Sequence, residues 1–234
     1  NTVLNSPTIK IEAITSIIDP EKCNFCGICA TVCPYQAIVA PDKKGKIPPQ
    51  VIEASCSGCG TCAAECPTDA IDMRHFMDKQ ILAQIDAILE DKPEEKIVVF
   101  ACNWCSYPGA DLAGTSRVQY PTTARLIRTM CSGRVDEDFI LYAFKKGAPI
   151  VLVSGCHFAD CHYIDAVTWT QRRIDRLWNK LERMGIRPER LQLEWISAAE
   201  DRRFARIIGE LEEMRKKVTR AEIKETIRIL SKTK

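Results

Sequence analysis

The second half of the chain alternates between short apolar runs and longer amphipathic stretches. Short, mainly apolar runs occupy residues 97–101, 126–130 and 150–154, and a weaker run spans residues 191–196. Runs of this length are typical of strands that are buried on both faces of a parallel sheet. We therefore expect a sheet of parallel strands in this half.

Amphipathic stretches accompany these predicted strands. Apolar residues recur at steps of three and four in residues 76–89, 136–146 and 163–184, which predicts helices. Gly147 and Gly185 follow the last two stretches and favour helix ends there.

Two further helix starts are predicted from capping boxes, in which Ser or Thr precedes Glu by three residues. They lie at residues 197–200 and 219–222. The alternation of strand and helix predicts an α/β domain with a doubly wound parallel sheet over residues 96–234. Residues 76–95 are expected to form a linker helix.

An internal repeat dominates residues 1–75. Residues 23–38 and 56–71 are identical at nine of 16 positions, and each copy reads C-x₂-C-x₂-C-x₃-C-P. In this spacing three thiolates bind one [4Fe–4S] cluster and the fourth reaches the other cluster, whereas paired zinc knuckles would leave the extra cysteines unexplained. We expect an α+β ferredoxin-like domain with two clusters. Its ligand sets would be Cys23, Cys26, Cys29 and Cys66 for the first cluster and Cys56, Cys59, Cys62 and Cys33 for the second.

The segments beside the repeats carry weaker signals. Residues 8–18 resemble a strand that leads into the first motif, and residues 40–49 are polar and proline-bearing, which predicts a hairpin or surface loop. The chain starts at Asn1 rather than at methionine. A fragment of a longer protein, a processed chain or an omitted start would each have this beginning.

Five more cysteines follow the predicted strands. Cys102, Cys131 and Cys156 come directly after three of them, and Cys105 and Cys161 lie further along the same loops. Because the carboxyl ends of parallel strands meet at one edge of a sheet, we expect the five thiols to gather in one crevice. Four thiolates suit zinc, a rubredoxin-like iron or a [2Fe–2S] cluster, and the redox centres of the first half favour the [2Fe–2S] cluster.

Some of these cysteines and the residues beside them also have simpler interpretations. A single buried cysteine is an ordinary small apolar residue, but five at strand ends indicate a site. His157 and His162 each follow a cysteine and could serve a Rieske-like centre, although hydrogen bonding near a helix start is the favoured interpretation. Trp104 and Trp169 are expected to be packing residues.

Composition narrows the possible functions. Thirty-three basic and 31 acidic residues nearly cancel and alternate along the predicted helices, so no nucleic-acid footprint is visible. The apolar runs are far shorter than the roughly 20 residues of a membrane helix, so no direct membrane insertion is expected. Cysteines in metal-ligand spacing, without a signal peptide, predict a reducing, cytoplasmic location.

Three stretches of the second half resemble a known family. CNWCSYPGADLAGTSR, IRTMCSGRVDEDFILYAFKKGAPIVLVSGCHFADCHY and RLQLEWISAAE are similar to the delta subunit of methyl-viologen-reducing hydrogenase, also described as the iron–sulfur D-type subunit of F420-non-reducing hydrogenase. The two cysteine motifs and the helix after them resemble the C-terminal ferredoxin domain of the A-type subunit of heterodisulfide reductase. The chain thus looks like a fusion of these two modules.

The resemblance implies an electron-transfer part of an oxidoreductase complex of the heterodisulfide reductase type. Its partners would be a hydrogenase or formate dehydrogenase, heterodisulfide-reductase-type subunits and a flavoprotein. Delta-type subunits carry a [2Fe–2S] cluster, which implies that four of the five second-half cysteines bind one. No G-x-G-x-x-G fingerprint follows a predicted strand, so FAD is expected only on a missing N-terminal part or on a partner.

Three functions remain open from the sequence. The leading one is a non-catalytic relay, because no open metal site, nucleotide loop or Ser-His-Asp arrangement is visible. The second is an enzyme that reduces a thiol or disulfide substrate at the five-cysteine site. The third is a structural adaptor that holds zinc there.

Overall fold

The computed structural model describes residues 12–42, 44 and 46–232. The first part of the predicted strand at residues 8–18 lies outside the described residues. The remaining part contains β1 (Ser16–Ile18), which pairs antiparallel with β4 (Ile71–Met73) so that Ser16 faces Met73.

The ferredoxin unit consists of short elements around the two cysteine motifs. Strands β2 (Ile38–Val39) and β3 (Gln50–Val51) form an antiparallel pair, and the predicted hairpin at residues 40–49 connects them. Helices α1 (Ile28–Thr31) and α2 (Thr61–Ala64) each start within a cysteine motif.

A parallel sheet of four strands forms the second half, which confirms the predicted α/β architecture. The strand order is β6-β5-β7-β8, with β5 pairing with β6 on one side and β7 on the other. The strands are β5 (Ile97–Cys102), β6 (Ala124–Thr129), β7 (Ile150–Gly155) and β8 (Leu191–Trp195).

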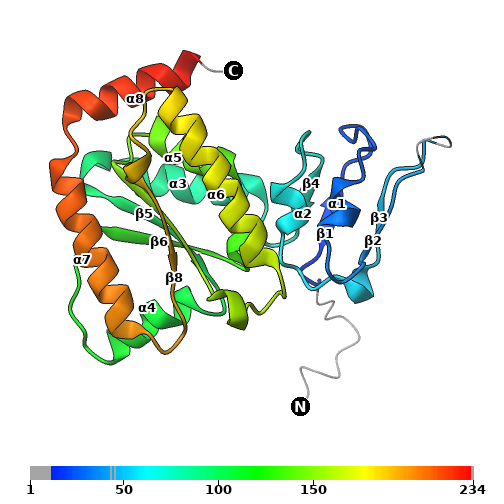
Figure 1. Cartoon of the computed structure of the whole chain (residues 1–234), viewed down its shortest axis with the longest axis horizontal. Helices are drawn as coiled ribbons and strands as arrows, with labels where there is room; N and C mark the ends of the chain where they lie inside the picture. Colours follow the sequence, from blue (N-terminus) through cyan, green and yellow to red (C-terminus); the bar gives the residue numbers. More distant parts are fainter. Residues whose placement is uncertain (1–11, 43, 45, 233–234) are drawn as a thin grey trace.

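Helices cover both faces of this sheet (Figure 1). One face packs against α4 (Ser106–Thr115) and α7 (Asp201–Lys217), and the other packs against α3 (Asp78–Leu89), α5 (Glu137–Lys145) and α6 (Ala166–Arg183). Helix α8 (Arg220–Lys232) lies against α5. Short 3₁₀ turns complete the chain: η1 (Glu53–Ser55), η2 (Pro93–Glu95), η3 (Ser132–Arg134), η4 (Phe158–Asp160) and η5 (Pro188–Arg190).

Three elements differ from the sequence-based expectation. The predicted linker helix is α3, whose Ile81, Ile85 and Leu89 are buried in the core of the α/β domain. Helix α4 was not predicted. The predicted capping box at residues 197–200 forms only in part. Glu200 accepts the Ser197 backbone N–H at 2.7 Å, but Ser197 Oγ accepts from the Ala199 N–H rather than from that of Glu200, and α7 begins only at Asp201. The box at residues 219–222 does start α8, with Thr219 Oγ1 accepting the Glu222 N–H.

Buried arginines join the two halves. Arg134 of η3 is 1% exposed and donates to the Phe76 carbonyl oxygen at 3.1 Å and to Asp72 at 3.1 Å, and it also pairs with Asp78. Arg173 of α6, equally buried, donates to Glu65 at 2.8 Å and to the Val135 carbonyl oxygen at 2.7 Å. Charged groups are buried only when they are paired, so these contacts hold the halves in one relative position.

Candidate metal centres

Two cavities of nearly equal size lie in the ferredoxin unit. The space between their lining residues, including the part open to solvent, is about 290 Å³ and about 320 Å³. Each is lined by three cysteines of one repeat and by the fourth cysteine of the other repeat, so the structure brings together both sets that the spacing predicts. The smaller cavity has Cys23, Cys26, Cys29 and Cys66, and the larger one has Cys33, Cys56, Cys59 and Cys62.

Glycines shape these cavities. Gly27 and Gly60 have φ of 83° and 81°, in the left-handed region, and α1 and α2 start directly after them. A Cβ on Gly58 would lie 2.5 Å from the Ile14 carbonyl oxygen, so the close approach of this backbone requires glycine there. The turns direct backbone donors at sulfur: the Ala70 N–H donates to Cys66 Sγ at 3.3 Å and the Phe25 N–H to Cys23 Sγ at 3.4 Å.

The two cavities differ in exposure. Cys26 of the first is exposed, whereas burial raises the pKa of Cys62 and Cys59 in the second. Burial also raises the pKa of Cys29 to about 11. A buried thiolate requires a nearby positive charge, which the irons of a cluster supply. Four converging thiols in each cavity therefore fit a cubane, and the second would be the better shielded.

The five second-half cysteines also meet. Cys102 Sγ lies 3.7 Å from Cys156 Sγ, and both form a buried group with Cys105, against which Cys161 packs. Cys161 also packs against the neighbouring buried group that contains Cys131, so the five thiols lie together.

The sheet topology explains why they converge. Strands β5 and β7 are neighbours, yet the helices that follow them, α4 and α6, pack on opposite faces. Such a switch point leaves a crevice beyond the strand ends, where open α/β sheets bind ligands. Cys102 ends β5 and Cys156 follows β7 directly.

Hydrogen bonds polarise this group of thiols. Bonds from Cys131 and Cys156 hold the pKa of Cys102 well below its usual range, whereas the same contact with Cys102 raises the pKa of Cys131. The arrangement thus favours the thiolate form of Cys102, and the thiolate is the form that binds metals. Within the described residues, no group of three or more His, Cys, Asp or Glu has the geometry of a single-ion site.

The two candidate histidines have other contacts. His157 Nε2–H donates to Glu200 Oε2 at 2.7 Å, just before α7, and the His162 ring stacks on Trp104 with 3.8 Å between centroids. Trp169 packs against the ferredoxin core, as expected of a packing residue. Trp104 is 40% exposed and donates to the Tyr163 hydroxyl at 2.9 Å.

The second ferredoxin cavity adjoins the five-cysteine site. Cys59, Tyr35 and Cys161 all pack against a buried group that contains Cys131 and Tyr163. The sequence did not indicate Tyr35 and Tyr163 as site residues, because neither belongs to a recognisable motif beyond its position two residues after a cysteine. A cysteine of the second cavity and a thiol of the five-cysteine site thus pack against the same buried group.

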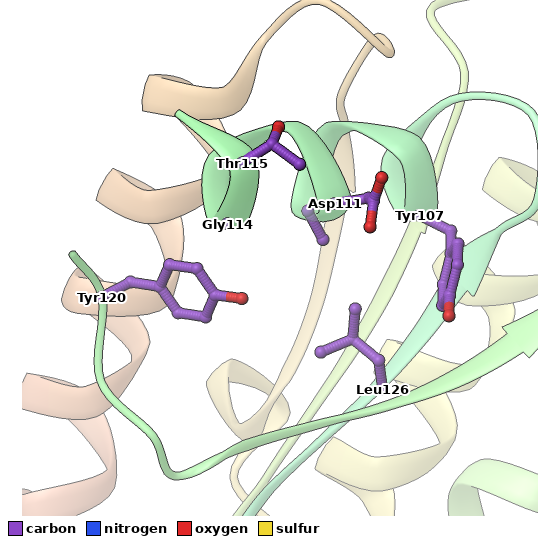
Figure 2. Close-up of a pocket in the computed structure, with 7 residues that line it drawn as sticks. Tyr107, Asp111, Gly114, Thr115, Tyr120 and Leu126 are labelled. Atoms are coloured by element: carbon purple, nitrogen blue, oxygen red, sulfur yellow. The ribbon is translucent and has the colours of Figure 1, made fainter. Parts of the chain in front are cut away.

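A larger hollow lies away from these sites. Figure 2 shows Tyr107, Tyr120 and Leu126 around it, between α4 and the edge strand β6. Its volume is about 800 Å³, but no cysteine lines it and Asp111 is its one carboxylate among the described lining residues. Metal chemistry therefore belongs to the cysteine sites rather than to this hollow.

Two four-cysteine cavities beside an α/β domain define an iron–sulfur protein of the dicluster ferredoxin class. Residues 22–70 match the family model of the 4Fe-4S dicluster domain, so the chain carries two [4Fe–4S] clusters. Residues 97–219 match the model described as methyl-viologen-reducing hydrogenase, delta subunit. The chain belongs to this family, which confirms the resemblance seen in the sequence.

Relatives match one or both halves. The chain is 46% identical over 209 residues, 89% of its length, to the A-type subunit of Ferredoxin:CoB-CoM heterodisulfide reductase from Methanosarcina mazei, but it spans only 26% of that protein. It is 53% identical over 111 residues to the iron–sulfur D-type subunit of the vhc F420-non-reducing hydrogenase from Methanococcus voltae, covering 47% of the chain and 77% of the relative. The corresponding hydrogenase subunit from Archaeoglobus profundus is 44% identical over 124 residues, 53% of the chain and 90% of the relative.

Among the helices of the described residues, none combines the length and the apolar character that crossing a lipid bilayer requires.

Proposed function

We propose that this chain relays electrons through three centres in the order first cubane, second cubane, [2Fe–2S] cluster. The relay would connect a hydrogenase or formate dehydrogenase with the flavin of a heterodisulfide-reductase-type complex, in either direction. The flavin would reside on a flavoprotein partner or on another part of a longer chain. The names of the relatives support the hydrogenase and the heterodisulfide reductase as partners, and a reducing compartment such as the cytoplasm suits exposed thiolate-bound iron.

One observation carries the proposal. Cys59 of the second cavity packs against the same buried group as Cys131 and Cys161 of the five-cysteine site. Two redox centres whose cysteines pack against one shared buried group are close enough to exchange electrons directly, whereas a zinc ion at the second position would end the path. The first cavity, with the exposed Cys26, would be the other terminus.

The packing of the five thiols suggests the ligands of the third cluster. Cys161 packs against both the group of Cys102 and Cys156 and the group of Cys131, and Cys102 and Cys131 shift each other's pKa. We assign Cys102, Cys131, Cys156 and Cys161 to the [2Fe–2S] cluster and Cys105 to an unligated thiol. When bound, the cluster supplies one-electron chemistry, and the protein supplies four thiolates and a dry crevice.

Metal analysis of the anaerobically purified chain tests the third centre. We expect about ten iron atoms and matching sulfide, since two four-iron clusters and one two-iron cluster add up to this number. Electron paramagnetic resonance of the reduced protein should show a [2Fe–2S] signal beside the cubane signals. About eight irons with one zinc would instead establish the structural adaptor.

Serine substitutions test the ligand assignment. Cys105→Ser should retain all iron, whereas Cys156→Ser should lose about two irons, because only the latter removes a ligand. The spare thiol also motivates the alternative enzyme, which would reduce a disulfide at this site. If Cys105→Ser keeps both its iron and its full electron-transfer rate, that alternative fails.

A further inference from the structure

A buried positive charge lies against the loop of the second cavity. Arg134 is 1% exposed, and a Cβ added to Gly60 would lie only 2.5 Å from the side-chain Cδ of this arginine. Gly60 lines the second cavity and lies between two of its cysteines, Cys59 and Cys62, in the chain. The stem of Arg134 therefore packs directly on the turn that carries these two cluster ligands.

The first repeat offers an internal comparison. Gly27 occupies the position of Gly60 in the first copy, and the atoms nearest to a Cβ added there belong to the Pro41 ring, at 3.8 and 3.9 Å. The two cavities have the same set of four cysteines, but the glycine turn of the second contacts a cation and that of the first contacts an uncharged ring. The repeats therefore place equivalent turns in different electrostatic surroundings.

The carboxylates that pair with Arg134 cancel only part of its charge at the cluster. The side chains of Asp72 and Asp78 are 30% and 41% exposed, whereas the side chain of Arg134 is 1% exposed. Water screens exposed charges much more strongly than buried ones. The guanidinium is therefore the least screened of the three charges, and its net effect on the second cavity is positive.

We propose that the buried charge of Arg134 raises the reduction potential of the second cubane. Reduction adds one electron to the cluster, and a nearby positive charge stabilises the added negative charge, so the reduced state is favoured. Arg134 ends η3, which starts directly after Cys131 of the five-cysteine site. Within the relay, and this consequence alone rests on the proposed function, Arg134 would favour electrons on the cubane next to the third centre.

Anaerobic potentiometric titration of the full chain, followed by electron paramagnetic resonance, measures the potentials of both cubanes. Arg134→Met keeps an apolar stem and removes the charge, so the wave of the second cubane should move to lower potential. We expect about a tenfold weaker reduction equilibrium, which is about 59 mV for a one-electron couple. Arg134→Lys keeps the charge and should titrate close to the original chain. Cys26→Ser changes a ligand of the first cubane and so identifies the wave of that cluster.

A change of opposite sign is available at a paired carboxylate. Asp78→Asn keeps the shape of this partly exposed side chain and leaves the charge of Arg134 less compensated. The wave that falls in Arg134→Met should therefore rise in Asp78→Asn. If Arg134→Met does not assemble its clusters, Asp78→Asn decides the matter, because an unchanged wave in that variant would contradict the proposal.

Arg190→Met is the matched control. Arg190 is 0% exposed, but it donates to the carbonyl oxygens of Ala148 and Pro149, before β7, whereas Cys156 follows the other end of that strand. Its loss should leave both cubane potentials unchanged. Unchanged potentials in Arg134→Met with full iron content would overturn the proposal, as would an equal shift in Arg190→Met. Failure of the relay would be seen separately, as about eight irons and no [2Fe–2S] signal, with the second cubane still responding to Arg134.

Discussion

The surroundings of the Asp136 carboxylate disfavour its charged form. It is the N-cap of α5, and its Oδ1 accepts the Asp138 N–H at 3.0 Å. Burial raises its pKa to about 6, although Arg173 and Arg134 act in the opposite direction. An aspartate in the unfolded chain titrates near 3.9, so the folded protein loses stability as the pH rises from about 4 through 6.

Asp136→Asn should therefore stabilise the protein at neutral pH. The amide oxygen can still cap α5, but no charge has to be buried, and the gain should reach about 2 kcal/mol above pH 7. Anaerobic urea unfolding at pH 5, 6, 7 and 8 measures it: the difference from the original chain should grow with pH and level off. The exposed Asp111→Asn is the control. Equal pH slopes in the Asp136 variant and the original chain would contradict the assignment.

For single residues, the sequence predicted the site correctly where the spacing of the cysteines determines which thiols lie together. C-x₂-C-x₂-C-x₃-C-P fixes which thiols share a cavity, because the local turn geometry follows from the spacing itself. Arg134 and Tyr163 could not be found in this way, since their neighbours Gly60 and Cys59 lie in the other half of the chain. Their roles depend on tertiary contacts that no local pattern records.

At the scale of elements, strong apolar stripes were predictable and weak ones were not. Helix α4 packs against α7, and its buried residues are all small, which leaves no large apolar periodicity in the sequence. Helix α3 was seen, but the sequence could not tell that Ile81, Ile85 and Leu89 face the sheet core rather than a linker surface. In the Ser197 box the serine hydroxyl accepts from Ala199 instead of Glu200, and Glu200 also pairs with His157, which is remote in the chain.

The pairing of α2 with α6 should contribute strongly to stability. Glu65, directly after α2, is 10% exposed and receives Arg173 and Arg176. Glu65→Ala would leave the buried Arg173 without its carboxylate, so we expect the free energy of unfolding to fall by about 3 kcal/mol. Circular dichroism during anaerobic urea unfolding measures this loss.

A surface pair on another helix supplies the control. Glu213 and Lys216 of α7 are both exposed, and Glu213→Ala should cost less than about 1 kcal/mol. Similar losses of unfolding free energy in the two variants would mean that the contact between Glu65 and Arg173 contributes little to holding the two halves together.

In the whole molecule, the buried arginines fix the distance between the cysteine sites of the two halves. Arg134 and Arg173 both join the ferredoxin unit to the α/β domain. Arg134 packs beside Gly60, and the neighbouring Cys59 packs against the buried group that contains Cys131. The two halves should therefore not separate during turnover. Electron exchange between the second and third centres would not await an encounter between molecules.

Kinetics after rapid partial reduction test this expectation. Redistribution of electrons between cubane and [2Fe–2S] signals should be first order, with a rate constant that stays the same when the protein is diluted about tenfold. A rate that falls in proportion to concentration would show that transfer occurs between molecules. Glu65→Ala, which weakens the union of the halves, should slow the internal step without removing iron.

The exchange of fourth cysteines between the repeats has a consequence for the ancestry of this fold. Cys66 completes the cavity of the first motif and Cys33 that of the second. A primitive chain with one motif could complete no cavity alone and would have needed a second identical chain, with the two related by a twofold axis. Gene duplication then joined two partners that already depended on each other, and it freed positions such as 28 and 61 to diverge.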